Sequence, residues 1–265
     1  MPDLRYHLIS LISVFLALAI GILLGVAMAD EGVVSDRLEA EISDIQQRFD
    51  RQRVEIGELQ ERAATDENLL EAMSETMISN RLTGIEVALV SGPYADQETV
   101  DGVENALDSS GANITSVEEL PAPSSPDEVT SGIEATTPVQ GEYTDTALSI
   151  LEETGEESFP PQAVVFIGGG ELPPESPTGT LRALNEAQAD MFEVWQDAGV
   201  RVVATESSDT ERSEIELFQS AGLASADNAD TSAGRASVIQ LLASDAEGSY
   251  GTKDTASELF PPAPE

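Results

Sequence analysis

The hydrophobic pattern of the chain begins with one long apolar run. From Leu8 to Ala29 no residue carries a charge, and Asp30 then opens an acidic region. Because a helix rises about 1.5 Å per residue, this run is long enough to cross a hydrocarbon core of about 30 Å. The pattern therefore predicts a transmembrane helix over residues 8–29, preceded by a short segment, residues 1–7.

The charges that flank this helix predict its orientation. Arg5 and His7 precede it, whereas Asp30 and Glu31 follow it, and basic residues favour the cytoplasmic side. We therefore expect a single-pass protein of the cytoplasmic membrane, with the N-terminus inside and the remainder outside. The competing interpretation is a cleaved signal peptide, because Ala27-Met28-Ala29 resembles a cleavage site. The apolar run is longer than that of usual signal peptides, which favours retention.

Small side chains recur at every fourth position of the predicted membrane helix. Such a strip lets two helices approach closely in lipid, and it therefore predicts a dimer face. The alternative is that small residues are simply common in membrane helices. The residues of the predicted face are Ser13, Ala17, Gly21, Gly25 and Ala29.

Apolar residues then follow a seven-residue repeat within residues 30–82. This spacing predicts a coiled-coil stalk, and Ile at a with Leu at d favours two strands. Since both chains leave the same membrane, the predicted homodimer is parallel. Gln52 and Asp66 interrupt the seam, where they either set the register or loosen the coil. The apolar seam residues are Leu38, Ile42, Ile45, Phe49, Ile56, Leu59, Ala63, Leu70, Met73 and Met77.

After the stalk, short apolar runs alternate with amphipathic stretches. Strands are expected at 85–90, 113–117, 163–167 and 200–205, and helices at 97–110, 143–153, 180–198, 211–221 and 233–243. This alternation predicts an α/β fold over residues 83–259, with a mainly parallel, Rossmann-like sheet and helices on both faces. Residues 120–141 are rich in Pro, Ser, Thr and Glu, so we expect an exposed low-complexity insertion there. Residues 260–265 are expected to form an extended tail.

Composition restricts the partners of the protein. The chain has 50 Asp and Glu against 12 Lys and Arg, a net charge of −38, and this excess argues against binding nucleic acid or an anionic lipid surface. Adaptation to high salt is favoured over a specific patch for a cationic partner, and both interpretations stay open. The absence of cysteine excludes disulfides, thiolate metal sites and cysteine nucleophiles.

Few residues of the α/β region carry recognisable chemistry. His7 is the only histidine in the chain, so no Ser-His-Asp triad can form there. The weak candidates for a cofactor crevice are the strand-ending Ser91 and Gly92 and the loop Gly168, Gly169 and Gly170. Because this loop matches neither GxGxxG nor a phosphate loop, a turn that needs flexible backbone is the favoured interpretation. We therefore expect that the protein is not an enzyme and that it has no catalytic residues.

Both ends of the chain resemble a known family. The matching segments are Asp3-Leu4-Arg5-Tyr6-His7-Leu8, the run from Val14 to Gly25, Asp227-Asn228-Ala229-Asp230-Thr231, Gly234, Tyr250-Gly251 and Leu259-Phe260-Pro261. They are similar to the bacterial copper transporter family named after mycobacterial MctB. The resemblance implies a role in copper homeostasis and a single membrane anchor. It also implies an alternative, regulation of cell-wall remodelling through an envelope partner, because the corynebacterial relative SteB works with a membrane partner, SteA.

The residues themselves give copper weak support. Cu(I) prefers thiolates and thioethers, but the chain has no Cys, one His and five Met. Met73 and Met77 lie in the predicted seam and Met191 lies in a predicted helix, so the metal ligands are left open. The physical interpretation is a dimeric scaffold or accessory factor, and an envelope enzyme that uses the sheet crevice is the least favoured alternative.

Overall fold

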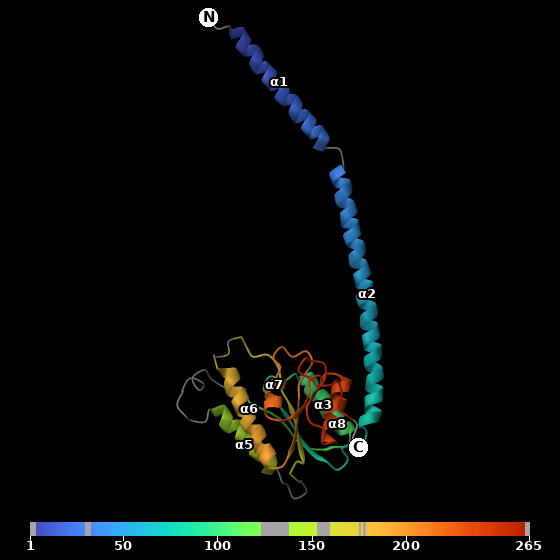
Figure 1. Cartoon of the computed structure of the whole chain (residues 1–265), viewed down its shortest axis with the longest axis vertical. Helices are drawn as coiled ribbons and strands as arrows, with labels where there is room; N and C mark the ends of the chain where they lie inside the picture. Colours follow the sequence, from blue (N-terminus) through green and yellow to red (C-terminus); the bar gives the residue numbers. More distant parts are fainter. Residues whose placement is uncertain are drawn as a thin grey trace. The chain divides into compact units, whose positions relative to one another are not determined.

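A computed structural model of the chain divides it into two units, Met1–Ala64 and Thr65–Glu265. Helix α1 (Leu4–Ala29) includes Tyr6–Ala27, which is long and apolar enough to cross a membrane (Figure 1). Among the described residues it is the one helix that meets this test. The structure describes residues 4–29, 33–122, 138–152, 160–174, 176 and 179–262.

Helix α2 (Val33–Ile78) covers most of the stalk that the heptad repeat predicts. Its described seam side chains are exposed; the exposed fraction is 51% for Ile42, 61% for Phe49 and 57% for Leu59. The side chain of Leu38 lies outside the described residues. The helix therefore agrees with the predicted stalk, whereas its pairing into a coiled coil stays a prediction.

The second unit contains a single six-stranded sheet in which all strands are parallel. Its strand order is β2-β1-β3-β4-β5-β6, which confirms the predicted α/β fold. Two strands were not predicted, β5 and β6, because they are three and two residues long and composed largely of Ala and Ser. The strands are β1 (Glu86–Ser91), β2 (Asn113–Glu119), β3 (Ala163–Ile167), β4 (Arg201–Thr205), β5 (Ala224–Ala226) and β6 (Ser249–Tyr250).

Helices cover both faces of this sheet, as predicted. Helices α3 and α8 share one apolar core with the sheet, and α5, α6 and α7 share the other, which contains the fully buried Trp195 and Phe166 (Figure 1). The helices are α3 (Gln97–Ser109), α5 (Pro138–Glu152), α6 (Thr180–Asp197), α7 (Ile215–Ser220) and α8 (Ser232–Leu242). The central strands β1, β3 and β4 are therefore buried on both faces, which explains their nearly continuous apolar sequences, whereas the edge strand β2 is largely polar and partly exposed.

Two helix boundaries differ from the sequence prediction. Helix α5 begins at Pro138, inside the predicted insertion 120–141, because proline is tolerated in a first helical turn. Helix α7 begins at Ile215 rather than near residue 211, since the preceding residues form hydrogen-bonded loop structure. Residues 123–137 of the predicted insertion lie outside the described residues.

Candidate functional site

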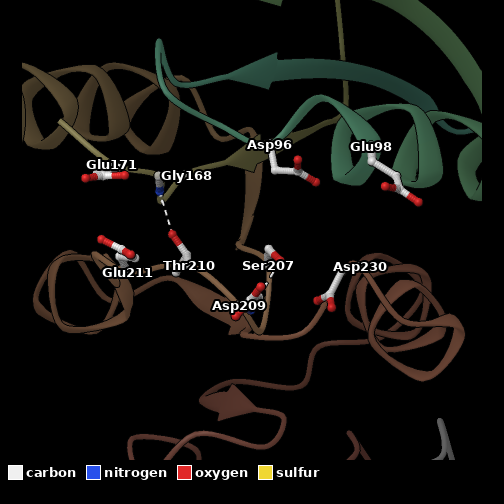
Figure 2. Close-up of a pocket in the computed structure, with 10 residues that line it drawn as sticks. Asp96, Glu98, Gly168, Glu171, Ser207, Asp209, Thr210, Glu211 and Asp230 are labelled. Atoms are coloured by element: carbon white, nitrogen blue, oxygen red, sulfur yellow. Dashed lines mark hydrogen bonds between the residues drawn. The ribbon is translucent and has the colours of Figure 1, made fainter. Parts of the chain in front are cut away.

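The order of the strands reverses between β1 and β3, and parallel sheets bind ligands beyond the carboxyl ends of their strands at such a point. A cleft of about 520 Å³ lies there. Figure 2 shows Asp96 and Glu98, from the start of α3, on one side, and Ser207, Asp209 and Asp230 on the other. The cleft is lined by Asp96, Glu98, Gly168, Gly170, Glu171, Ser207, Asp209, Thr210, Glu211 and Asp230.

The glycine loop after β3 forms part of this cleft, but its backbone N–H groups are already bonded. Gly168 N donates to Thr205 O at 2.8 Å. Gly169 N donates to Glu214 Oε2 at 3.0 Å, and Gly170 N donates to Thr210 Oγ1 at 2.6 Å. A phosphate cradle needs free N–H groups, so this geometry favours the predicted turn over a nucleotide site.

Ser91 and Gly92, the other predicted crevice residues, are not among the residues that line the cleft. The carbonyl of Ser91 accepts a hydrogen bond from Leu120 N, and Gly92 N donates to Ile167 O, both at 2.8 Å. These bonds tie the end of β1 to its neighbours. The structure therefore brings Gly168 and Gly170 to the cleft, while Ser91 and Gly92 serve the sheet; a cofactor at any of them stays a prediction.

Two buried carboxylates lie beneath the cleft, and each is neutralised from within. Glu206 is fully buried and pairs with Lys253 Nζ, and its other oxygen accepts from Glu214 N at 2.6 Å. Glu214 pairs with Arg212 at 2.6 Å. Since a buried charge is costly unless it is paired and hydrogen-bonded, these two cations are occupied in stabilising the fold.

The lining of the cleft is strongly acidic. Six of its ten lining residues are Asp or Glu, and none is Lys, Arg or His. Two of the carboxylates are structural, because Asp96 caps α3 by accepting from Thr99 N, and Asp230 accepts from Ser208 N. In the part of the chain that the structure describes, no three His, Cys, Asp or Glu side chains are grouped closely enough to hold a metal ion. The cleft therefore repels anions.

Sequence reasoning missed these carboxylates, although a signal for them existed. Asp96 and Glu98 follow β1, Glu171 follows β3, and Asp209 and Glu211 follow β4. Residues after parallel strands converge at one edge of the sheet. The overall acidity of the chain concealed this convergence, because acidic residues occur throughout the unit.

The last turns of α2 attach to the α/β unit through one face of the helix. Ile78 is buried in the core that α3 and α8 share. Glu67 Oε1 accepts hydrogen bonds from Ser232 N at 2.9 Å and from Ser232 Oγ at 2.7 Å, at the start of α8. Ser74 is half-buried on the same side. In the heptad numbering of the seam, these contacts occupy positions b and e.

The seam face of the same turns stays free. Leu70, Met73 and Met77, at positions a and d, are 44%, 53% and 49% exposed. The α/β unit and the apolar seam thus use different faces of one helix segment. A second helix can therefore pack along the seam without displacing the domain.

The predicted dimer face of α1 is open as well. A Cβ added to Gly21 or Gly25 would meet no atom within 4 Å, and Ser13 and Ala17 are exposed. Ser13 Oγ donates to Ile9 O at 2.9 Å, which satisfies the hydroxyl within the helix. The side chain of Ala29 lies outside the described residues. Pairing through this face stays a prediction.

Comparison with known proteins places these features in context. A family model described as "Copper transport outer membrane protein, MctB" matches residues 1–156 and 128–261. The copper transporter MctB of Mycobacterium bovis and that of two Mycobacterium tuberculosis strains are 28% identical over 120 residues. This region is 45% of the present chain and 38% of each relative, so the match spans well under half of their length.

Proposed function

This chain belongs to the MctB family of copper transport proteins, and from that premise we propose that it is a copper-homeostasis protein acting as a dimeric, non-enzymatic scaffold or accessory factor. In this proposal α1 is a single-pass anchor in the cytoplasmic membrane. Arg5 and His7, at the start of α1, favour the cytoplasmic side for the N-terminus, and α2 carries the α/β unit outside.

The two faces of α2 are the observation that carries the proposal. Between residues 67 and 78 the domain occupies positions b and e through Glu67 and Ile78, while a and d residues such as Met73 stay exposed. A helix that exposes an apolar stripe alongside its own folded domain needs a partner for that stripe. The heptad spacing of the stripe suits a second copy of the same helix.

The chemistry of the cleft supports a scaffold rather than an enzyme. Its glycine-loop amides are bonded to protein groups, as shown for Gly169 and Gly170. The nearby cations Arg212 and Lys253 are paired with buried carboxylates. None of the described lining residues is His, Lys or Cys, the side chains that most often serve as base or activated nucleophile in acyl and phosphoryl transfer.

Single-cysteine crosslinking tests the dimer directly, because the natural chain has no cysteine. Ile56→Cys lies at an a position, and Val54→Cys lies two residues away at an f position on the outer face. Both side chains are exposed in one chain, 54% and 62%. In membranes under mild oxidation, Ile56→Cys should form a disulfide-linked dimer, since a disulfide needs Cα atoms within about 7 Å. Val54→Cys should stay monomeric.

Equal crosslinking at the two positions would indicate random collision and would contradict the parallel coiled coil.

The copper role is tested in cells that lack the protein, where copper tolerance should fall and the full chain should restore it. The pairing-defective variant Ile56→Asp/Leu59→Asp, confirmed to be expressed, should not restore tolerance. Unchanged tolerance in the deleted strain would remove copper from the proposal.

A further inference from the structure

Two thioethers stand one helical turn apart on the free seam of α2. Met73 and Met77 are 53% and 49% exposed, whereas Met191 is fully buried in the core of the α/β unit. Among the methionine side chains that the structure describes, these two are therefore the ones accessible to a soluble ligand. They lie where α2 is held by the domain, since Ser74 between them is half-buried and Ile78 is buried.

Pairing of two chains would bring two copies of this methionine pair together. In a parallel coil Met73 occupies a d layer and Met77 the next a layer, so two-fold symmetry brings four sulfurs into two successive layers. Helix axes in such contacts lie about 8–10 Å apart. Because methionine is long, unbranched and flexible, the four sulfurs can converge on one point near the axis.

The chemistry of this cluster selects a soft cation. Thioethers favour Cu(I), whereas Mg²⁺ and Ca²⁺ prefer oxygen ligands. The surrounding helix is net negative: Glu67, Glu71 and Glu75 accompany the two methionines, and Arg81, just after the helix, donates from Nε to Met77 O at 3.0 Å. This local negative potential attracts a cation and repels anions.

Packing alone does not call for methionine here. Leu at d and Ile at a are the residues that best specify a two-stranded coil, and methionine specifies a core poorly because it is flexible. The seam uses Ile at positions 42 and 56 and Leu at 59 and 70, but changes to Met at 73 and 77. The change falls at the end of the coil that the domain holds in place.

We propose that Met73 and Met77 of two chains form a Cu(I)-binding site of thioether ligands at the domain end of the coil. This inference rests on the dimer of the proposed function. It places the copper of the family on the stalk rather than in the acidic cleft, and it requires both copies of the chain.

The test is a Cu(I) titration of the full chain in lipid nanodiscs, under anaerobic reducing conditions, in competition with a chromophoric Cu(I) chelator. The natural chain should bind one Cu(I) per two chains. The variant Met73→Leu/Met77→Ile keeps ideal coil residues and should weaken binding at least 100-fold. Met191→Leu, which removes a buried thioether, should bind as the natural chain does. X-ray absorption of the bound copper should show sulfur ligands.

Dimerisation is followed in parallel nanodisc samples without copper, by crosslinking through Ile56→Cys under mild oxidation, so the two proposals fail separately. A crosslinked dimer without bound Cu(I), or with binding that Met73→Leu/Met77→Ile leaves unchanged, overturns the thioether site and leaves the dimer standing. Copper surrounded only by oxygen or nitrogen overturns the site as well. Absence of the crosslinked dimer overturns the proposed function together with this inference.

Discussion

Two glycines in the loop after β3 lie where no side chain would fit. Gly170 has a φ of +103°, and an added Cβ would lie 1.7 Å from the carbonyl oxygen of Tyr94. Gly168 is equally confined, because its Cβ would lie 2.3 Å from Glu214 Oε2. The backbone of this loop therefore packs closely against the segments that follow β1 and β4, where it forms part of the cleft lining.

Gly170→Ala should therefore lower the free energy of unfolding by more than about 2 kcal/mol, through backbone strain and overpacking. Gly141→Ala is the matched control. It lies in α5 with nothing within 4 Å of an added Cβ, and it should raise stability by about 0.5 kcal/mol. Urea unfolding of both variants measures the difference, and equal effects would contradict the packing argument.

The buried Tyr143 should make the stability of the folded protein depend on pH in the alkaline range. Its pKa is raised chiefly by burial and further by the negative charge of Glu214, with Arg212 opposing; its hydroxyl donates to Pro121 O at 3.2 Å. The folded state thus holds this proton more tightly than the unfolded state, whose tyrosine pKa is about 10. The resulting stability is fully present below about pH 10 and is lost as pH rises above it.

Between about pH 10 and 12 the unfolding free energy of the natural chain should consequently fall more steeply than that of Tyr143→Phe. At pH 7 the variant should be less stable by about 1 kcal/mol, because its hydrogen bond is lost. Denaturant unfolding at a series of pH values gives both quantities. Parallel curves would show that Tyr143 does not couple proton binding to folding.

At the scale of elements, the last turns of α2 present one face to the α/β unit and leave another face, the apolar seam, exposed. Its seam is free for a partner, while Glu67 caps the first turn of α8 and Ile78 anchors the helix in the core. A carboxylate at a helix N-terminus satisfies an otherwise unpaired N–H group and interacts favourably with the helix dipole. The orientation of the last turns of α2 on the domain is thereby set.

Glu67→Ala should destabilise the α/β unit by about 1 kcal/mol, since Ser232 N and Oγ lose their acceptor. Glu67→Gln keeps an oxygen acceptor and should lose less. Glu75→Ala, at an exposed carboxylate of the same helix, controls for the change in charge and helix propensity. Chemical denaturation of the three variants measures their free energies of unfolding. A loss of stability as large in Glu75→Ala as in Glu67→Ala would contradict the capping role of Glu67.

At the scale of the whole molecule, the main feature that we expect to affect stability is the large net negative charge. The chain carries a net −38, and in the α/β unit Lys253 and Arg212 are engaged with buried Glu206 and Glu214. Their positive charges therefore do little to offset the acidic surface. High net charge aids solubility but destabilises the compact state through self-repulsion.

Salt should accordingly stabilise the protein. Raising the salt concentration from 0.1 M to 1 M shortens the screening length from about 10 Å to about 3 Å. We expect a gain of about 2 kcal/mol, or roughly 4–8 °C in Tm, measured by thermal unfolding. NaCl and KCl should act equally at equal ionic strength; an effect confined to one cation would indicate specific binding instead.

Local patterns were enough to predict most of the elements of this protein, though not β5 and β6. The uncharged run of α1, the heptads of α2 and the strands at β1, β3 and β4 each carry a strong periodic or apolar signal, because each buries or exposes a continuous face. Gly111 and Gly199 follow the ends of α3 and α6 with φ values of +77°, as helix-ending glycines commonly do. The family resemblance was likewise readable from ordered strings at both ends of the chain.

Only the tertiary structure decided how these elements meet. Strands β5 and β6 are too short to give a sequence signal; β5 forms by pairing with the edge of β4, and β6 by pairing with β5. The bonded amides of the glycine loop depend on Thr210 and Glu214, some 40 residues away. The contact of Glu67 with Ser232 spans 165 residues. A one-dimensional pattern records which face of a helix is apolar, but which face a distant domain covers depends on contacts that only folding creates.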